Sequence, residues 1–228
     1  MVIGGLQKLS LIDYPEKVAA VVFTQGCLFR CAYCHNPELL GANDNTVHEE
    51  EILSYLRARR GFLDGVVITG GEPTIHRDLP EFIAKIKALG LLVKLDTNGV
   101  NPAMVARLIA RTLVDYVAMD LKHVWERYNT IARVKKTEYA ENPKKTFAII
   151  QSSGIDHEFR TTVLPGAHTE EDLTTMAGYL KDGEKYYLQN IRYEKTLERN
   201  LDTGLLFDVS DIIHNLRMRF PNVAIAER

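Results

Sequence analysis

The chain has 228 residues, 46% of them hydrophobic, and a formal net charge of −2. This length can bury the core of a single domain, which we expect to include all of residues 1–228. The balanced charge does not favour nucleic acid as a partner, and the longest apolar run, residues 18–23, is far shorter than the about 20 residues that span a bilayer. We therefore expect no membrane partner and a cytoplasmic protein.

Short β-branched runs alternate with longer amphipathic runs along the chain. In chain order, the pattern predicts a strand over residues 18–24, a helix over 49–60, a strand over 65–69, a helix over 79–89, a strand over 91–96 and a helix over 102–111. The second half repeats this order, with strands over 114–121, 158–164 and 186–191 that are followed by helices over 143–152, 170–180 and 208–220. Six such units predict an α/β fold with a parallel sheet, open and curved as a three-quarter barrel.

The three cysteines of the chain, Cys27, Cys31 and Cys34, lie in the stretch CLFRCAYC, directly after the first predicted strand. A disulfide is disfavoured because their number is odd and a reducing cytosol keeps thiols free. Structural zinc needs a fourth ligand, and the nearby candidate, His35, adjoins Cys34 so closely that joint ligation would strain the backbone. A four-iron cluster held by three cysteines would leave one iron with an open position for chemistry.

Polar motifs follow the next three predicted strands, at the sheet edge where active sites of parallel sheets lie. The motifs are GGEP at residues 70–73, DTNG at 96–99 and MDLK at 119–122. Taken singly, the first two are ordinary turns and the third is a strand end that could face solvent. On the fifth strand, Arg160 could bind a carboxylate of a ligand or pair with a buried acidic group of the barrel.

Together, these features resemble a known family. The pattern C-x-x-x-C-x-x-C with Tyr33 before the last cysteine is similar to the motif of the radical S-adenosylmethionine (SAM) enzymes. The opening segment 3–17, the segment 23–39 and the GGEP, DTNG and DLK motifs resemble the glycyl-radical activating enzymes, and among them the anaerobic ribonucleoside-triphosphate reductase activating proteins. This resemblance covers most of the first 125 residues and implies a partial (βα)6 radical SAM barrel.

The resemblance also implies cofactors and a reaction. SAM would chelate the open iron of a 4Fe-4S cluster, a flavodoxin or ferredoxin would reduce the cluster, and the resulting 5′-deoxyadenosyl radical would take a hydrogen atom from a glycine of a large partner enzyme. Cys27, Cys31 and Cys34 would hold the cluster. The implied SAM-binding residues are Tyr33, Gly70, Gly71, Glu72, Asp96, Thr97, Lys122, Arg160 and Gln189. The implied ligands of a monovalent cation are Asp96, Thr97, the backbone carbonyl of Met119 and Asp120.

Two other interpretations remain open from the sequence. The first is a radical SAM enzyme that acts on a small molecule such as a pterin, because such an enzyme would share every cofactor motif. The second is a non-enzymatic iron–sulfur or zinc protein, which would leave the GGEP, DTNG and DLK motifs unexplained.

Overall fold

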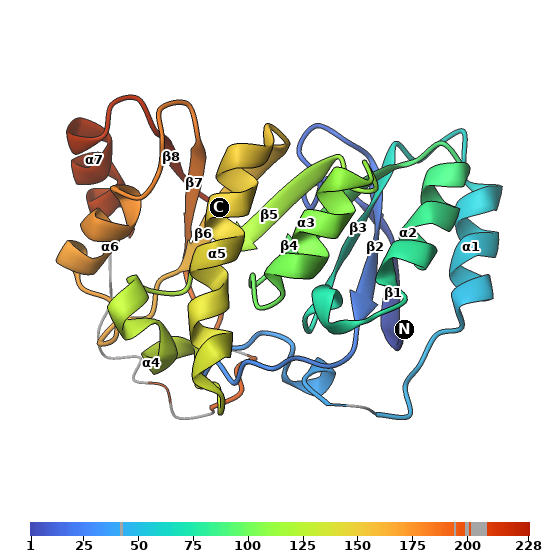
Figure 1. Cartoon of the computed structure of the whole chain (residues 1–228), viewed down its shortest axis with the longest axis horizontal. Helices are drawn as coiled ribbons and strands as arrows, with labels where there is room; N and C mark the ends of the chain where they lie inside the picture. The colour runs from blue at the N-terminus through green and yellow to red at the C-terminus, as the bar shows by residue number, and fades with distance from the viewer. Residues whose placement is uncertain (42, 194, 199–200, 202–208) are drawn as a thin grey trace.

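The computed structural model describes residues 1–41, 43–193, 195–198, 201 and 209–228. Its centre is an eight-stranded sheet with the strands in chain order (Figure 1). Strand β1 (Ile3–Ser10) is antiparallel to β2 (Ala19–Thr24), and the later neighbours are parallel. These later strands are β3 (Gly65–Gly70), β4 (Leu92–Thr97), β5 (Tyr116–Asp120), β6 (Asp156–Thr162), β7 (Lys185–Gln189) and β8 (Ala224–Glu227).

The six expected helices are present in the described chain. They are α1 (Glu49–Ala58), α2 (Leu79–Ala88), α3 (Pro102–Ala110), α5 (Thr137–Ser153), α6 (Glu170–Ala177) and α7 (Val209–Arg219). The predicted start of the last helix, Asp208, lies outside the described residues. Figure 1 shows α1, α2, α3 and α5 side by side along one face of the sheet. The prediction of an open α/β sheet flanked by helices is confirmed.

Four elements differ from the sequence prediction. Strands β1 and β8 add one strand at each edge of the sheet, beyond the six that we expected. A short helix, α4 (Tyr128–Ala132), follows β5. Helix α5 begins at Thr137 rather than at Pro143, so the proline lies inside the helix. Proline usually marks a first helical turn because it lacks an N–H donor, and this preference led the prediction to the wrong start.

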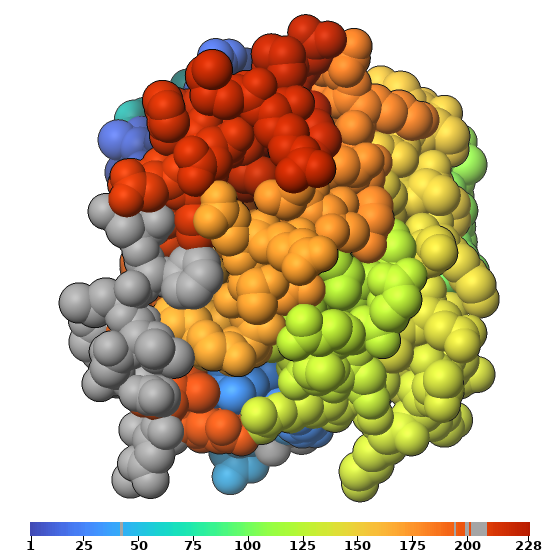
Figure 2. Space-filling view, turned by 90° about the vertical axis from the view of Figure 1, so that its left-hand side faces the viewer, coloured from blue at the N-terminus to red at the C-terminus, as the bar shows by residue number. Residues whose placement is uncertain are grey.

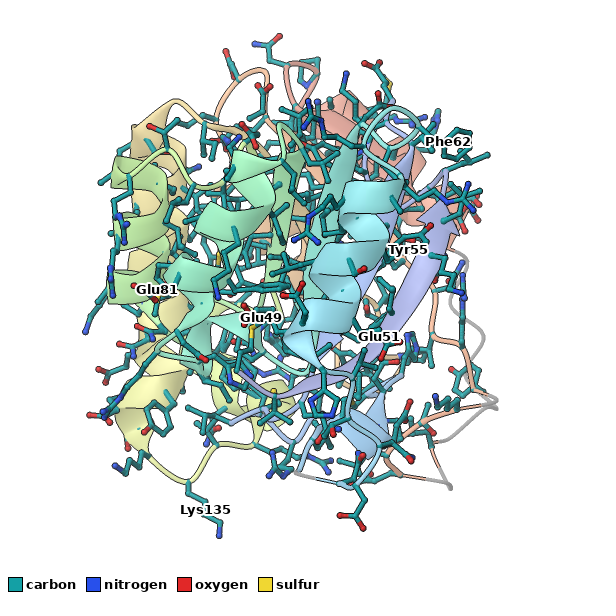
Figure 3. The ribbon with its side chains drawn as sticks, turned by 90° about the vertical axis from the view of Figure 1, so that its right-hand side faces the viewer. Glu49, Glu51, Tyr55, Phe62, Glu81 and Lys135 are labelled. Carbon is teal, nitrogen blue, oxygen red and sulfur yellow. The ribbon has the colours of Figure 1, made fainter. Side chains whose placement is uncertain are left out.

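Two apolar layers hold the sheet in place. The larger core lies between the sheet and the helices, whereas a small cluster of Tyr14, Val21, Val67 and Tyr116 fills one end of the barrel interior. Helix α1 is tied to the edge strand β1, because the Tyr55 hydroxyl donates to the Lys8 carbonyl at 2.7 Å (Figure 3). At the opposite end of the sheet, α7 packs beside α6 and β8 (Figure 2). The rest of the barrel interior is polar and leads to the site.

Over the described ranges, none of the helices has both the length and the apolar character that a membrane span requires.

Candidate functional site

A cavity of about 230 Å³ lies at the carboxyl ends of the parallel strands β2 to β7. Its lining brings together thirteen of the fourteen residues that the sequence analysis singled out. These are Cys27, Tyr33, Cys31, Cys34, Gly70, Gly71, Glu72, Asp96, Thr97, Asp120, Lys122, Arg160 and Gln189. The exception is Met119, whose implied ligand is its carbonyl and whose buried side chain belongs to the core between the sheet and the helices.

The cysteine loop is shaped mainly by hydrogen bonds of its own backbone. It leaves β2 through Gly26, which has a φ of 94° and donates its N–H to Leu39 at 2.7 Å. The Arg30 guanidinium then bonds to the Cys27 carbonyl at 2.6 Å, and the Arg30 N–H bonds to the Ala132 carbonyl at 2.8 Å. The loop is therefore folded in advance, with two of its three thiols buried and the third half-buried.

The three cysteine side chains are protonated thiols until a metal binds. Burial raises the pKa of Cys27 to about 12 and that of Cys31 to about 11, and it also raises the pKa of Cys34. Lys122 opposes the shift at all three thiols. Since only thiolates ligate metals, binding of a cluster must displace these protons.

A single zinc ion fits this loop poorly. Among the described residues, no three His, Cys, Asp or Glu side chains are close enough together to hold one metal ion. The His35 Nε2 atom accepts a hydrogen bond from the Arg192 N–H at 3.2 Å, so this nitrogen is already occupied. The three sulfurs line one cavity without converging on one ion, which suits a larger group.

Glu72 connects the ends of strands β3 and β4. It is fully buried and accepts hydrogen bonds from the Thr74 N–H at 3.0 Å, from the Thr97 hydroxyl at 2.8 Å, from the Asn98 N–H at 2.6 Å and from the Thr74 hydroxyl. Burial raises the pKa of Glu72, and these four donors oppose that shift because they favour the ionised carboxylate. The sequence marked Glu72 as an acceptor for a ligand, and the structure shows that it also positions the DTNG turn.

The two glycines of the GGEP motif meet a requirement of the backbone. Gly70 has a φ of 112°, and a Cβ atom there would lie 2.4 Å from the Thr24 nitrogen. A Cβ atom on Gly71 would lie 2.3 Å from the Gly26 carbonyl oxygen. The resemblance implied that both glycines bind SAM, whereas in the structure the end of β2 and the loop after it already require them.

The polar wall of the cavity is a network of ion pairs. Arg160 on β6 bonds to Asp120 at 3.0 Å and to Asp96 at 3.3 Å, and Lys122 bonds to Asp120 at 2.9 Å. Burial alone would raise the pKa of Asp120, but Lys122 and Arg160 hold it well below its usual value. Of the two roles considered for Arg160, pairing with buried acidic groups is therefore the one the structure displays.

Tyr33 lines the cavity and carries a buried, unpaired polar atom. Its ring is buried, and its hydroxyl is a buried side-chain oxygen without a hydrogen-bond partner among the described residues. The Lys122 ammonium lies 5.5 Å from the centre of the Tyr33 ring. Because buried polar groups nearly always have partners, this hydroxyl suits a polar ligand in the cavity.

Residues 21–180 match the family described as the Radical SAM superfamily. The chain belongs to this superfamily. It is 35% identical over 190 residues to a Methanocaldococcus jannaschii protein named as a glycyl-radical enzyme activating enzyme, covering 82% of this chain and 78% of that protein. It is 29% identical over 191 residues to the pyruvate formate-lyase-activating enzyme of Clostridium pasteurianum, covering 79% of this chain and 76% of that enzyme. The chain is thus a radical SAM enzyme similar to glycyl-radical activases.

Solved structures agree on the fold. A radical SAM methyltransferase from Sphaerobacter thermophilus superposes with a TM-score of 0.66 and 16% identity, covering 96% of this chain and 68% of that one. Streptococcus suis SuiB bound to precursor peptide SuiA superposes with a TM-score of 0.65 and 14% identity, covering 91% of this chain and 48% of SuiB. The radical SAM chain spans about half the length of SuiB, and at such identities the likeness concerns the fold alone.

The radical SAM family implies a 4Fe-4S cluster and SAM, and the donor set in the cavity fits both. Three thiols in one loop supply three cluster ligands and leave the fourth position to another molecule. The unpaired Tyr33 hydroxyl and the charged groups along β4 to β6 supply polar partners for a zwitterionic nucleotide.

Asn98 is a site residue that the sequence analysis mentioned only as a turn residue. Its amide Nδ2 lies 3.5 Å from the Cys27 sulfur, within hydrogen-bond reach of a sulfur acceptor. The sequence did contain one indication that Asn98 belongs to the site, because it follows the predicted site residue Thr97 in the DTNG motif. A hydrogen bond to a ligand sulfur stabilises the reduced, more negative cluster and so raises its reduction potential.

We expect the Asn98→Leu variant to have a cluster that is harder to reduce. Loss of a hydrogen bond worth about 1 kcal/mol corresponds to a potential about 40 mV more negative for a one-electron couple. Redox titration of the reconstituted protein, followed by electron paramagnetic resonance, measures this shift. Asn101→Leu is the control, because Asn101 caps α3 and bonds to Thr74 without contacting a cysteine. Equal potentials in the Asn98 variant and the wild type would contradict this role.

His168 bonds to the backbone of Lys122 but does not line the cavity. Its Nδ1 accepts the Leu164 N–H at 2.9 Å and its Nε2–H donates to the Lys122 carbonyl at 2.8 Å, so the ring is neutral with a defined tautomer. Burial lowers the pKa of His168 to about 4, and the neighbouring His123 ring adds to that shift.

We expect stability to depend on pH through His168. Because the folded pKa of about 4 lies below the ordinary histidine pKa of 6.5, the folded state binds the proton less readily than the unfolded chain. Neutral His168 therefore contributes about 3 kcal/mol to the unfolding free energy above pH 6.5, and this contribution is lost as the pH falls toward 4. Urea unfolding between pH 7 and 4 should therefore show a smaller loss in His168→Gln than in the wild type. The exposed His214→Gln is the control, and identical pH profiles for all three proteins would contradict the prediction.

Proposed function

We propose that this enzyme generates a glycyl radical on a partner enzyme, and that the partner is an anaerobic ribonucleoside-triphosphate reductase. The observation that carries the proposal is a cavity in which three cysteines, and no fourth, lie together with the SAM-type motifs of three strand ends. The relatives named as glycyl-radical activating enzymes support the general reaction. The choice of reductase rests on the resemblance of the N-terminal segments to its activating proteins.

When bound, the cluster and SAM together supply the one-electron chemistry that removes a hydrogen atom from glycine. In the proposal, Cys27, Cys31 and Cys34 hold three irons and leave the fourth open to the amino and carboxylate groups of SAM. The unpaired Tyr33 hydroxyl would bond to the nucleotide. The Lys122 ammonium lies near the Tyr33 ring and bonds to Asp120, which holds it in place.

The remaining polar residues have positioning roles in this proposal. Glu72 holds the DTNG turn, and through Asn98 that turn reaches the Cys27 sulfur. Gln189 lines the cavity at the end of β7, where it can meet the ribose or the glycine segment. These roles require no side-chain acid or base, because the step transfers a hydrogen atom rather than a proton.

Reductive cleavage of SAM with and without the partner tests the proposal. The protein is reconstituted with iron and sulfide without oxygen, then mixed with dithionite and SAM, and 5′-deoxyadenosine is measured. We expect slow cleavage by the protein alone, and a glycine-centred radical signal when the reductase is added. A flavodoxin or ferredoxin should replace dithionite as the electron donor.

The matched control is a reductase whose radical-bearing glycine is replaced by alanine, which should give no radical signal. A protein that carries its cluster but never cleaves SAM would overturn the proposed reaction. Cleavage that is stimulated by a pterin and leaves the reductase without a radical would favour the small-molecule alternative instead.

A further inference from the structure

The inner face of the sheet carries a row of alternating charges that begins at Lys94, a residue to which the sequence analysis gave no role. The Lys94 ammonium lies 2.6 Å from Asp96 Oδ1, and Asp96 Oδ2 lies 3.3 Å from Arg160. Arg160 bonds to Asp120 Oδ1 at 3.0 Å, and Asp120 Oδ2 bonds to Lys122 at 2.9 Å. Each of the four carboxylate oxygens therefore has a cationic N–H donor from the chain itself.

Lys94 occupies a position where a lysine is costly. It lies in β4 between Val93 and Leu95, both fully buried in the core against the helices. Residues two apart on a strand share a face, so Lys94 and Asp96 both point into the barrel. The Lys94 residue is 0% exposed, and a fully buried charge persists only when it is paired.

The charge of Lys94 balances Asp96, whose other cationic partner, Arg160, is shared with two further carboxylates. Burial lowers the pKa of Lys94, while Asp96 and Glu158 oppose that shift. Without Lys94, Asp96 would depend on Arg160 alone, and Arg160 also faces Asp120 at 3.0 Å and Glu158 at 3.9 Å. A buried carboxylate that loses one of two cationic partners must recruit another cation or a proton.

This arrangement does not fit the added monovalent cation that the resemblance implied at Asp96, Thr97, Met119 and Asp120. The four carboxylate oxygens already accept N–H groups, and the Thr97 hydroxyl already donates to Glu72 at 2.8 Å. A sodium or potassium ion at these carboxylates would lie beside the positive charges of Lys94, Arg160 and Lys122, which repel it. The ammonium of a side chain already occupies this place, and it does not lose translational entropy on each occasion of binding.

We propose that the Lys94 ammonium is a built-in monovalent cation, which holds Asp96 in place and makes an added sodium or potassium ion unnecessary. Lys94 is then a positioning residue, because it acts on the cavity through Asp96 and Arg160 and does not line it. The expected effect of Lys94 on SAM binding rests on the proposed function. The expected effect of Lys94 on the unfolding temperature of the cluster-free protein does not.

The test compares salts of the same ionic strength in the wild type and in Lys94→Met, whose side chain is about as long but uncharged. Thermal unfolding of the cluster-free protein is measured in potassium, sodium and tetramethylammonium chloride. We expect the wild type to unfold at the same temperature in all three. We expect Lys94→Met to unfold at a lower temperature in tetramethylammonium chloride and to be partly restored by potassium or sodium, which can enter the vacated space.

SAM binding gives the second measurement, by equilibrium dialysis of the reconstituted proteins. We expect one dissociation constant for the wild type in all three salts, and for Lys94→Met a dissociation constant about tenfold weaker in the tetramethylammonium salt than in the potassium salt. The control is Lys87→Met, because Lys87 pairs with Asp115 at 2.7 Å in a partly exposed position outside the barrel. Its unfolding and SAM binding should be insensitive to the choice of cation.

Wild-type SAM binding that strengthens with potassium or sodium would overturn the inference without any variant. Unfolding of Lys94→Met that is equal in all three salts would also overturn it. If neither protein binds SAM in any salt, the proposed function fails, and the unfolding measurements still decide the role of Lys94.

Discussion

Replacement of Cys31 with alanine is expected to abolish cluster assembly and SAM cleavage together. Cys31 is buried and lies between the other two ligands in the loop, so its loss leaves two thiols, separated by six residues, to hold four irons. Iron and sulfide content after reconstitution should fall to the level of unfolded protein, and 5′-deoxyadenosine should fall to the background. Retention of a cluster with normal cleavage would show that another residue replaces Cys31.

His35→Ala is the matched control for this experiment, because His35 adjoins Cys34 and lines the same cavity. In the structure its ring accepts the Arg192 N–H at 3.2 Å, so we expect the variant to keep its iron and sulfide. A protein that binds one zinc ion and no sulfide, and that loses the zinc in His35→Ala, would instead indicate a structural zinc site of three cysteines and one histidine.

Replacement of Arg160 with methionine is expected to produce the largest loss of stability. The Arg160 side chain is 13% exposed and lies between Asp96, Asp120 and Glu158. Removal of one partner from a buried ion network leaves uncompensated charge, which costs about 3–5 kcal/mol of unfolding free energy. Urea unfolding of the cluster-free protein measures this change. SAM affinity should fall as well, because Asp96 and Asp120 both line the cavity.

Arg107→Met provides the comparison for Arg160. Arg107 on α3 pairs with Glu81 at 3.2 Å on the surface, where Figure 3 shows Glu81 on α2, and both side chains are about half exposed. Such exposed pairs contribute roughly 0–1 kcal/mol, so this variant should remain close to the wild type. If the Arg160 variant were no less stable than the Arg107 variant, the buried network would not be a structural element of the barrel.

The sequence predicted the sheet and the site well where local patterns carry the information. Strands β2 to β5 are mainly apolar, β6 and β7 contain aromatic and β-branched residues, and amphipathic helices separate the strands; this alternation predicts a parallel sheet. Because all parallel strands end at one edge, the motifs after β2, β3, β4 and β5 had to meet, and they do. The cysteine spacing then predicted the chemistry of that edge.

The features that the sequence did not predict depend on partners distant along the chain. Strand β1 contains two glycines and several polar residues, and becomes a strand only through pairing with β2. The four donors to Glu72 come from two different turns. Lys94 did leave a signal, namely a lysine inside an apolar strand two residues before Asp96, but its meaning requires knowledge of the barrel interior.

The central claim is that three cysteines leave one iron of the cluster open to SAM. Electron paramagnetic resonance of the reduced, reconstituted protein tests it most directly, in the presence and absence of SAM. We predict a 4Fe-4S signal that changes when SAM is added, because the nucleotide enters the coordination of one iron. A cluster whose spectrum is the same with saturating SAM, with every iron ligated by side chains of the protein, would contradict the account.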